Sequence, residues 1–292
     1  RYVDGKHPQA EIKIFPEQVE PVRIAEHALV AVSAVDGQRY QRAGRNDLIV
    51  HGHVVDRPAH LSGGRRMNSH HFREGAIEQI RVLPDGQDPV VFRTLRQQSA
   101  KKQGVPQLAL ADFIAPEDAG LQDYIGCFCV TAGIGVAREA ARLEAAGDDY
   151  GSIMLKALAD RLAEAFAEYL HREVRMKHWG YAPGETLDND ALIREAYRGI
   201  RPAPGYPACP DHLEKQTLWE LLGVEAAIGV RLTENLAMWP AASVSGYYFA
   251  HPESRYFGLG KIRTDQLADY ARRRGLPLEE ARKWLSPNLA ED

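Results

Sequence analysis

The hydrophobic and polar positions after residue 90 follow regular periods, and the clearest one predicts a helix over residues 148–175. An apolar side chain recurs every four residues there, at Tyr150, Met154, Leu158, Leu162, Phe166 and Leu170. This spacing predicts a helix with a wide buried face. Asp148 or Asp149 can cap its start, because a carboxylate accepts hydrogen bonds from the free N–H groups of the first turn.

Start and stop signals predict four shorter helices further along the chain. Capping acids, a first-turn proline and terminal glycines or prolines place them at residues 189–198, 210–223, 264–275 and 278–286. The segments between them alternate in polarity or are rich in aromatic residues. They predict a strand at 229–234, a hairpin over 243–262, and a strand pair at 107–114 and 123–133.

Strand pairs followed by helices, without a repeated strand–helix–strand alternation, favour an α+β fold with a twisted antiparallel sheet and flanking helices. Cys127 and Cys129 alternate within the predicted strand 123–133, so both thiols should face one side as small buried groups. Three cysteines give no disulfide framework, which fits a reducing compartment.

The chain divides near residue 90 into an N-terminal segment, 1–90, and a domain, 91–292. The first part holds seven of the eleven histidines and only short apolar runs, of which residues 27–35 and 48–55 read as strands. The pairs His51/His53 and His70/His71 suggest a metal site, but their spacing matches no standard zinc pattern. We therefore expect no metal ligands in this chain.

Composition and charge argue against two classes of partner. The net charge is −4, so no broad basic field is available for nucleic acid or an anionic membrane. No stretch has the length of a membrane span and no signal peptide opens the chain, so we expect a cytoplasmic protein. The first residue, Arg1, suggests a fragment of a longer protein.

The segment 201–210, RPAPGYPACP, has the composition of a stiff, irregular arm. Its four prolines remove backbone donors and fix φ, so it is neither helix nor central strand. Its few free backbone groups suit a heterocycle, Arg201 matches a carboxylate, Gly205 permits close approach and Tyr206 offers a flat face. The alternative is a plain connection between helices with Arg201 in a surface ion pair, and residue chemistry alone favours this alternative.

A resemblance to a known family favours the ligand-binding interpretation of this arm instead. The string GIRPAPGYPACPDHLEK, residues 199–215, resembles the signature of the activation domain of cobalamin-dependent methionine synthase. Further strings follow the order of that family: LRQQ at 95–98, LADFIAP at 110–116, KALADRLAEAFAEYLH at 156–171, WGYAP at 179–183, LTENLAMWPAASVSGYYFAHPESRYF at 232–257 and WLSPNL at 284–289. The resemblance covers essentially all of 91–292.

The resemblance implies a domain that binds S-adenosylmethionine and supplies neither a catalytic side chain nor a metal ligand. By position, the ligand contacts would be Arg201, Gly205, Tyr206, Tyr256, Phe257, Glu164 and Glu195. The chemistry agrees, because a carboxylate, an ammonium, a sulfonium and an adenine call for a guanidinium, carboxylates and aromatic faces.

Several of these residues also have structural interpretations. Glu164 lies on a charged helix stripe that would ordinarily face solvent. Tyr256 and Phe257 are neighbours on a predicted strand, so they should face opposite sides, with at least one in the core. We expect His212, in the first turn of a predicted helix, to be solvated or locally bonded.

The implied function is reductive reactivation within methionine synthase, the 5-methyltetrahydrofolate–homocysteine methyltransferase. S-Adenosylmethionine held by this domain would methylate the corrinoid while flavodoxin or an equivalent reductase reduces inactive cob(II)alamin on the cobalamin-binding domain. The chain has no Asp-x-His-x-x-Gly cobalamin motif, so it should bind ligand without making methionine alone. The alternatives are a stand-alone activator that docks on a separate corrinoid protein, and a folded remnant that binds no ligand.

The N-terminal segment departs from the family pattern. The family has a tryptophan-containing helix with an acidic ligand contact before the LRQQ string, whereas the first tryptophan here is Trp179. Residues 1–90 are therefore either a divergent module or a mistranslated stretch, and one acidic contribution to the ligand site is in doubt.

Overall fold

The computed structural model describes residues 30–33, 50–52, 78–82, 89–115 and 123–290. Within them, a four-stranded sheet has the order β2-β1-β5-β8, formed by Val50–Gly52, Val30–Ser33, Gly126–Thr131 and Ser243–Tyr248. The pairs β1–β5 and β5–β8 are antiparallel, and only β1–β2 is parallel. The predicted α+β class with a mainly antiparallel sheet and flanking helices is confirmed.

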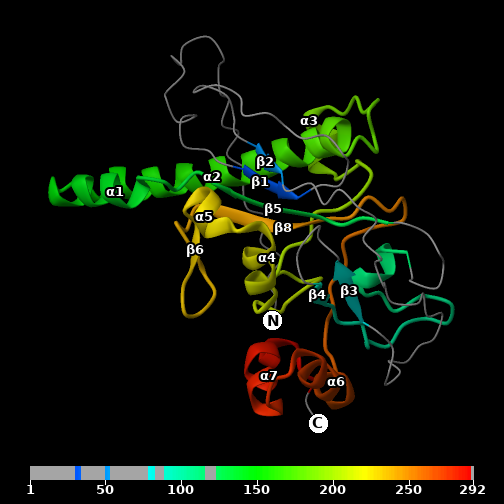
Figure 1. Cartoon of the computed structure of the whole chain (residues 1–292). Coiled ribbons are helices and arrows are strands. Elements are labelled where there is room, and N and C mark those ends of the chain that lie inside the picture. Colours follow the sequence, from blue (N-terminus) through cyan, green and yellow to red (C-terminus); the bar gives the residue numbers. More distant parts are fainter. Residues whose placement is uncertain (1–29, 34–49, 53–77, 83–88, 116–122, 291–292) are drawn as a thin grey trace.

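The long helix α2 (Asp149–Glu173) lies along one side of this sheet, while α4 (Glu214–Leu222) and α5 (Val224–Ile228) lie on the other (Figure 1). Successive side chains of strand β5 point to opposite faces of the sheet, so the strand contributes to the hydrophobic packing on both faces. Phe128 and Val130 join a hydrophobic cluster with α2, whereas Cys127 and Cys129 join the larger cluster that includes α4 and α5. All three cysteines are buried and free, as the alternation at 127 and 129 predicts.

The predicted long helix is confirmed as α2, but the face predicted to be buried is largely exposed. Asp148 caps its start, accepting a hydrogen bond from the Gly151 N–H at 2.8 Å. The side that packs on the protein is a narrow stripe of small residues, among them Ala159, Ala163 and Ala167. Most apolar residues that the pattern assigned to the interior are exposed, namely Tyr150, Met154, Leu158 and Leu162. A four-residue spacing advances by about 40° per step around a helix, so such a row cannot stay on one face over this length.

The remaining helices follow their predicted signals to different degrees. Helices α6 (Thr264–Arg274) and α7 (Leu278–Leu285) have the expected bounds. Helix α4 ends at Gly223 as predicted but begins four residues after Pro210, and α3 (Asn189–Ile193) is shorter than predicted. Several helical elements were not predicted, among them α5, α1 (Val136–Ala145), which packs against α2, and a π-helical turn, η4 (Val174–His178), at the end of α2.

Two predicted strand pairings are wrong. The first arm of the predicted 243–262 hairpin is β8, but it pairs with β5, and the second arm runs as irregular chain. In that arm the Leu259 N–H donates to the Pro207 carbonyl oxygen at 2.7 Å instead. Residues 107–114 contain a 3-10 turn, η2 (Leu110–Phe113), rather than a strand. The strand at 229–234 is the short β6 (Arg231–Leu232), paired with β7 (Met238–Trp239).

Residue 90, where the sequence suggested a boundary, lies inside a hairpin. Strand β3 (Gln79–Val82) pairs with β4 (Val90–Arg93), and Glu78 directly before it is buried. The predicted strands at 27–35 and 48–55 appear as β1 and β2, while His53, His70 and His71 lie outside the described residues. The part of the chain before residue 90 therefore contributes backbone to the four-stranded sheet and to the β3–β4 hairpin.

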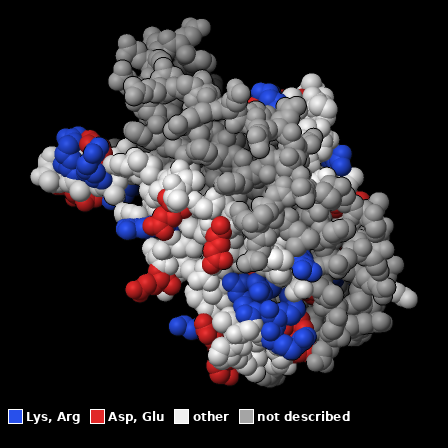
Figure 2. Space-filling model, viewed as in Figure 1, with Lys and Arg blue, Asp and Glu red and all other residues white. Residues whose placement is uncertain are grey.

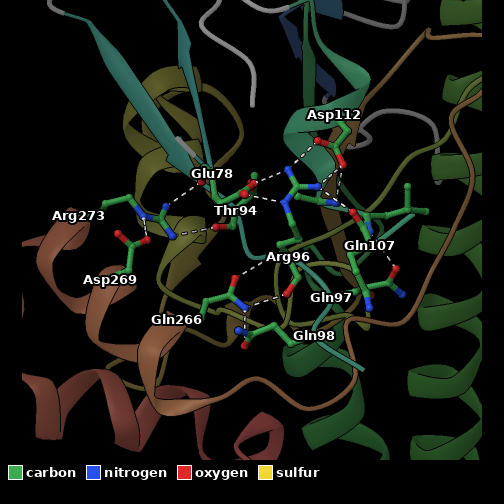
Figure 3. A network of polar contacts seen from close by, with 12 residues as sticks. Glu78, Thr94, Arg96, Gln97, Gln98, Gln107, Asp112, Gln266, Asp269 and Arg273 are labelled. Atoms are coloured by element: carbon green, nitrogen blue, oxygen red, sulfur yellow. Dashed lines mark hydrogen bonds and ion pairs between the residues drawn. The ribbon is translucent and has the colours of Figure 1, made fainter. Parts of the chain in front are cut away.

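A buried polar network joins this hairpin to α6 (Figure 3). Arg96 bonds both Glu78 and Asp112 through paired N–H···O contacts of 2.6–2.7 Å. Burial disfavours its charge, but the two carboxylates outweigh burial and raise the pKa of Arg96. From α6, Gln266 bonds the Arg96 backbone and Arg273 bonds the carbonyl oxygens of Glu78 and Thr94. The LRQQ string, residues 95–98, therefore lies in a buried polar network that holds the β3–β4 hairpin against α6.

Charge on the face viewed in Figure 2 is mixed. Basic side chains gather near the end of the molecule formed by α6 and α7, with acidic side chains close to them. No helix among the described residues is both long and apolar enough to cross a membrane.

Candidate functional site

The proline-rich arm is held at the end of β8. Ile200 and Phe249 exchange two backbone hydrogen bonds of 3.0 Å, and the Tyr247 N–H donates to the Pro202 carbonyl oxygen at 2.9 Å. This close approach requires Gly246, because a Cβ there would lie 2.6 Å from the Pro202 oxygen. The base of the arm therefore continues the sheet as a fixed extension.

The middle of the arm is a tight turn around Gly205. Its φ is +92°, its N–H donates to the Cys209 carbonyl oxygen at 2.7 Å, and a Cβ would lie 2.5 Å from the His212 ring. His212 is locally bonded, as expected, with Nδ1 3.0 Å from Lys215 Nζ. The Ala203 N–H, between two prolines, has no hydrogen-bond partner among the described residues. Ala203 is half-buried, so this backbone donor of the arm is available to a ligand.

Arg201 emerges from the base of this arm and meets α2. Its Nη1 lies 2.5 Å from Glu168 Oε2, and its backbone N–H donates to the Tyr256 hydroxyl at 2.9 Å. Burial lowers the pKa of Arg201, but the Glu168 carboxylate outweighs this effect, so the net pKa is raised. Neither Nε nor Nη2 has a partner among the described residues, and neither is among the buried unpartnered atoms. One guanidinium edge therefore stays open toward solvent.

Aromatic rings surround this ion pair. His171 stacks on Tyr248 with ring centroids 5.1 Å apart and meets Tyr197 edge-on at 4.9 Å, while Arg175 lies 4.2 Å above the Tyr197 ring. Burial, together with the charges of Arg175 and Arg201, holds the pKa of His171 well below its usual value. The imidazole is therefore neutral and adds no charge to the site.

The same group of residues contains polar atoms with unused bonding capacity. Glu168 Oε1, His171 Nδ1, Arg175 Nη1 and the Tyr248 hydroxyl are buried without a partner among the described residues. Such atoms are rare in folded proteins, and each calls for a reason beyond packing. Their concentration behind Arg201 singles out this part of the α2 face.

The structure brings only some of the predicted site residues together. Arg201 and Tyr256 are in direct contact, and Tyr256 is 38% exposed. Phe257 packs against Phe113 of the core, with ring centroids 6.4 Å apart, although Tyr256 and Phe257 lie in irregular chain rather than on the predicted strand. The Gly205 turn contacts His212 rather than the ion pair.

Three other predicted residues form no hydrogen bond or ion pair with Arg201 within the described part of the chain. Tyr206 is 58% exposed on the arm. Glu164 is exposed one turn before Glu168 on α2, and Glu195 is exposed after α3 with a positive φ of 54°. Their roles stay predictions.

Sequence reasoning missed the partners of Arg201. Glu168 lies on the same charged stripe as Glu164, four residues later, but nothing in the spacing separates the two. Tyr197 and His171 carried no signal, because their positions depend on how α2 meets the arm. A separate cleft of about 400 Å³ between α4 and α6–α7, lined by Arg93, Arg274 and Trp284 among others, contains none of the predicted site residues.

These features define an α+β domain in which an arginine on a proline-rich arm lies beside the exposed ring of Tyr256. The chain matches the model of the family described as vitamin B12-dependent methionine synthase, activation domain, over residues 73–275, and it belongs to that family. The match begins before residue 90 and includes the β3–β4 hairpin.

A solved structure supports the same assignment. It is described as the crystal structure of the MetH reactivation domain bound to AdoHcy, and it is 52% identical to this chain with a TM-score of 0.71. The similarity covers 80% of this chain and 69% of that chain.

Proposed function

We propose that this chain binds S-adenosylmethionine and supplies its methyl group for the reductive reactivation of cob(II)alamin in methionine synthase. The observation that carries the proposal is the open guanidinium edge of Arg201 beside Tyr256, on a rigid arm with a free Ala203 N–H. Family membership and a 52% identical domain described as bound to AdoHcy add support.

The donor set fits this ligand. The open edge of Arg201 presents two N–H groups in the geometry that a carboxylate accepts. The exposed ring of Tyr256 can attract a cation such as a sulfonium, and the Ala203 N–H can donate to an adenine nitrogen. Glu164 and Glu195 are our predicted acidic contacts to the ammonium, while Gly205 and Tyr206 shape the arm and Phe257 backs it from the core side.

The role of the chain is binding and orientation. Bound S-adenosylmethionine supplies a methyl group on a cationic sulfur, which is the reactive element of this chemistry. Arg201 and the arm fix the amino-acid end and the adenine end of the ligand, so that the sulfonium is presented in one orientation to a partner. No side chain of the chain acts as a nucleophile or base in this account.

The partners follow from the family. We propose docking on the cobalamin-binding domain of methionine synthase, with flavodoxin or an equivalent reductase supplying the electron in the cytoplasm. The chain alone should bind the ligand without forming methionine. Adding it to a methionine synthase that lacks its activation domain should restore reactivation after oxidation. Failure to do so, with ligand binding intact, would contradict the proposed partner.

Calorimetric titration tests the ligand. The 292-residue chain should bind S-adenosylmethionine with one site, and Arg201→Ala should weaken binding by about 2 kcal/mol, or roughly thirtyfold, because a charge-assisted bidentate contact is lost. An absence of binding by the wild type would identify the chain as a folded remnant. Unchanged binding by Arg201→Ala would place the site elsewhere.

A further inference from the structure

Glu168 occupies a position on α2 that the resemblance did not assign. Its Oε2 accepts from Arg201 Nη1 at 2.5 Å, across 33 residues of sequence. Its side chain is 29% exposed and that of Arg201 is 19% exposed, so the pair lies at the edge of the protein interior. Its other oxygen, Oε1, is buried without a partner among the described residues.

The arm fixes the backbone of Arg201 but not its side chain. The hydrogen bonds of Ile200, Pro202 and the Arg201 N–H all involve main-chain atoms of the arm. Arginine has several rotatable bonds, and holding a guanidinium in one direction costs conformational entropy that a partner must offset. Among the described residues, Glu168 alone makes a hydrogen bond to this guanidinium.

We propose that Glu168 is the positioning residue of the ligand site, holding Nη1 so that the Nε and Nη2 edge of Arg201 meets the ligand carboxylate. This inference rests on the proposed function. Glu168 acts through Arg201 and does not itself touch the ligand, since its free oxygen is sealed from solvent. Glu164 is exposed, and among the described residues it makes no hydrogen bond or ion pair with Arg201, so it does not hold the guanidinium in this way.

A pair of ligands separates positioning from general support. S-Adenosylhomocysteine carries the carboxylate, whereas 5′-methylthioadenosine keeps the adenosine and the thioether without the amino-acid end. In calorimetric titrations of the full chain, Glu168→Gln should weaken S-adenosylhomocysteine binding by about tenfold, since a preorganised charge-assisted contact is lost. Its affinity for 5′-methylthioadenosine should equal that of the wild type. The control Asp160→Asn, an exposed site two turns earlier on α2, should change neither affinity.

A double-mutant cycle tests whether Glu168 acts through Arg201. In an Arg201→Gln background, Glu168→Gln should cause no further loss of S-adenosylhomocysteine affinity, because the group it positions is gone. An additive loss overturns the proposal, as does wild-type affinity in the single Glu168→Gln variant. Equal weakening of both ligands also overturns it, since that result describes a general structural role. Binding of neither ligand by the wild type overturns the proposed function together with this inference.

Discussion

Two arginines of this chain, Arg96 and Arg201, lie in strings shared with the family, yet their surroundings differ. Arg96 is 1% exposed and bonds two carboxylates and a backbone carbonyl. Arg201 bonds one carboxylate and keeps a free edge, with buried unpartnered atoms behind it. A saturated arginine stabilises a fold, whereas an arginine with spare donors is available to a ligand. The difference shows that a shared motif does not by itself mark a binding site.

The largest expected effect comes from breaking the saturated arginine. Arg96→Met should lower the free energy of unfolding by about 3–5 kcal/mol, because Glu78 and Asp112 would remain buried without their partner. Urea denaturation measures this loss. Arg142→Met removes an exposed ion pair with Glu139 and should leave stability unchanged. Equal stability of the Arg96 variant and the wild type would contradict a stabilising role for the Arg96 network.

A smaller effect is expected where the arm meets β8. Gly246→Ala would place a Cβ 2.6 Å from the Pro202 carbonyl oxygen, so the arm must shift. We expect a loss of about 1–3 kcal/mol in unfolding free energy and weaker S-adenosylhomocysteine binding by about tenfold or more. Gly184→Ala has no neighbour within 4 Å and serves as the control. A Gly246 variant with normal affinity would show that the arm does not set the site.

The free energy of unfolding should also depend on pH, through the buried carboxyl group of Glu214. Burial raises the pKa of Glu214, which bonds Arg274 of α6, to about 7. Because the folded pKa exceeds the unfolded one, this group's contribution is fully present below pH 4.5 and is lost as pH rises toward 7. Between pH 5 and 8, Glu214→Gln should reduce the fall in unfolding free energy by about 1–3 kcal/mol. If the unfolding free energies of variant and wild type fell equally with pH, Glu214 would not titrate in this range.

The smallest effects should come from the exposed side of α2. Leu158→Gln should change the unfolding free energy by no more than about 0.5 kcal/mol, because the side chain is 51% exposed. Ala163→Leu, on the packed stripe, should cost about 1–3 kcal/mol by overpacking. Thermal or urea unfolding compares the two. A larger loss of stability for Leu158→Gln than for Ala163→Leu would support the buried face that the apolar spacing predicts.

Local signals predicted local structure well. Asp148 marked the start of α2, and Thr264 and Gly275 marked the ends of α6, because caps depend on neighbouring residues. Pairing was harder, because alternation identifies a strand without naming its neighbour. Strand β8 pairs with β5, more than a hundred residues upstream, instead of the chain that follows it.

The candidate site was predictable only in part. The string 199–215 located the arm through resemblance, whereas the strand expected at Tyr256 and Phe257 is irregular chain. The partner of Arg201 was not predictable, because two glutamates four residues apart look alike until the helix is placed on the sheet. The β3–β4 hairpin, which spans residue 90, carried no sequence signal, because the ion pair between Glu78 and Arg96 beside it depends on the folded chain.

The contrast between the two arginines can be tested in a single thermal-unfolding series with and without S-adenosylhomocysteine. At a ligand concentration of about 100 times Kd, the wild type should gain about 2.7 kcal/mol of stability. Arg201→Ala should unfold within about 1 kcal/mol of the unliganded wild type, because its ion pair is partly exposed, and it should lose most of the ligand-induced gain. A full ligand-induced gain in Arg201→Ala, or none in the wild type, would contradict the account.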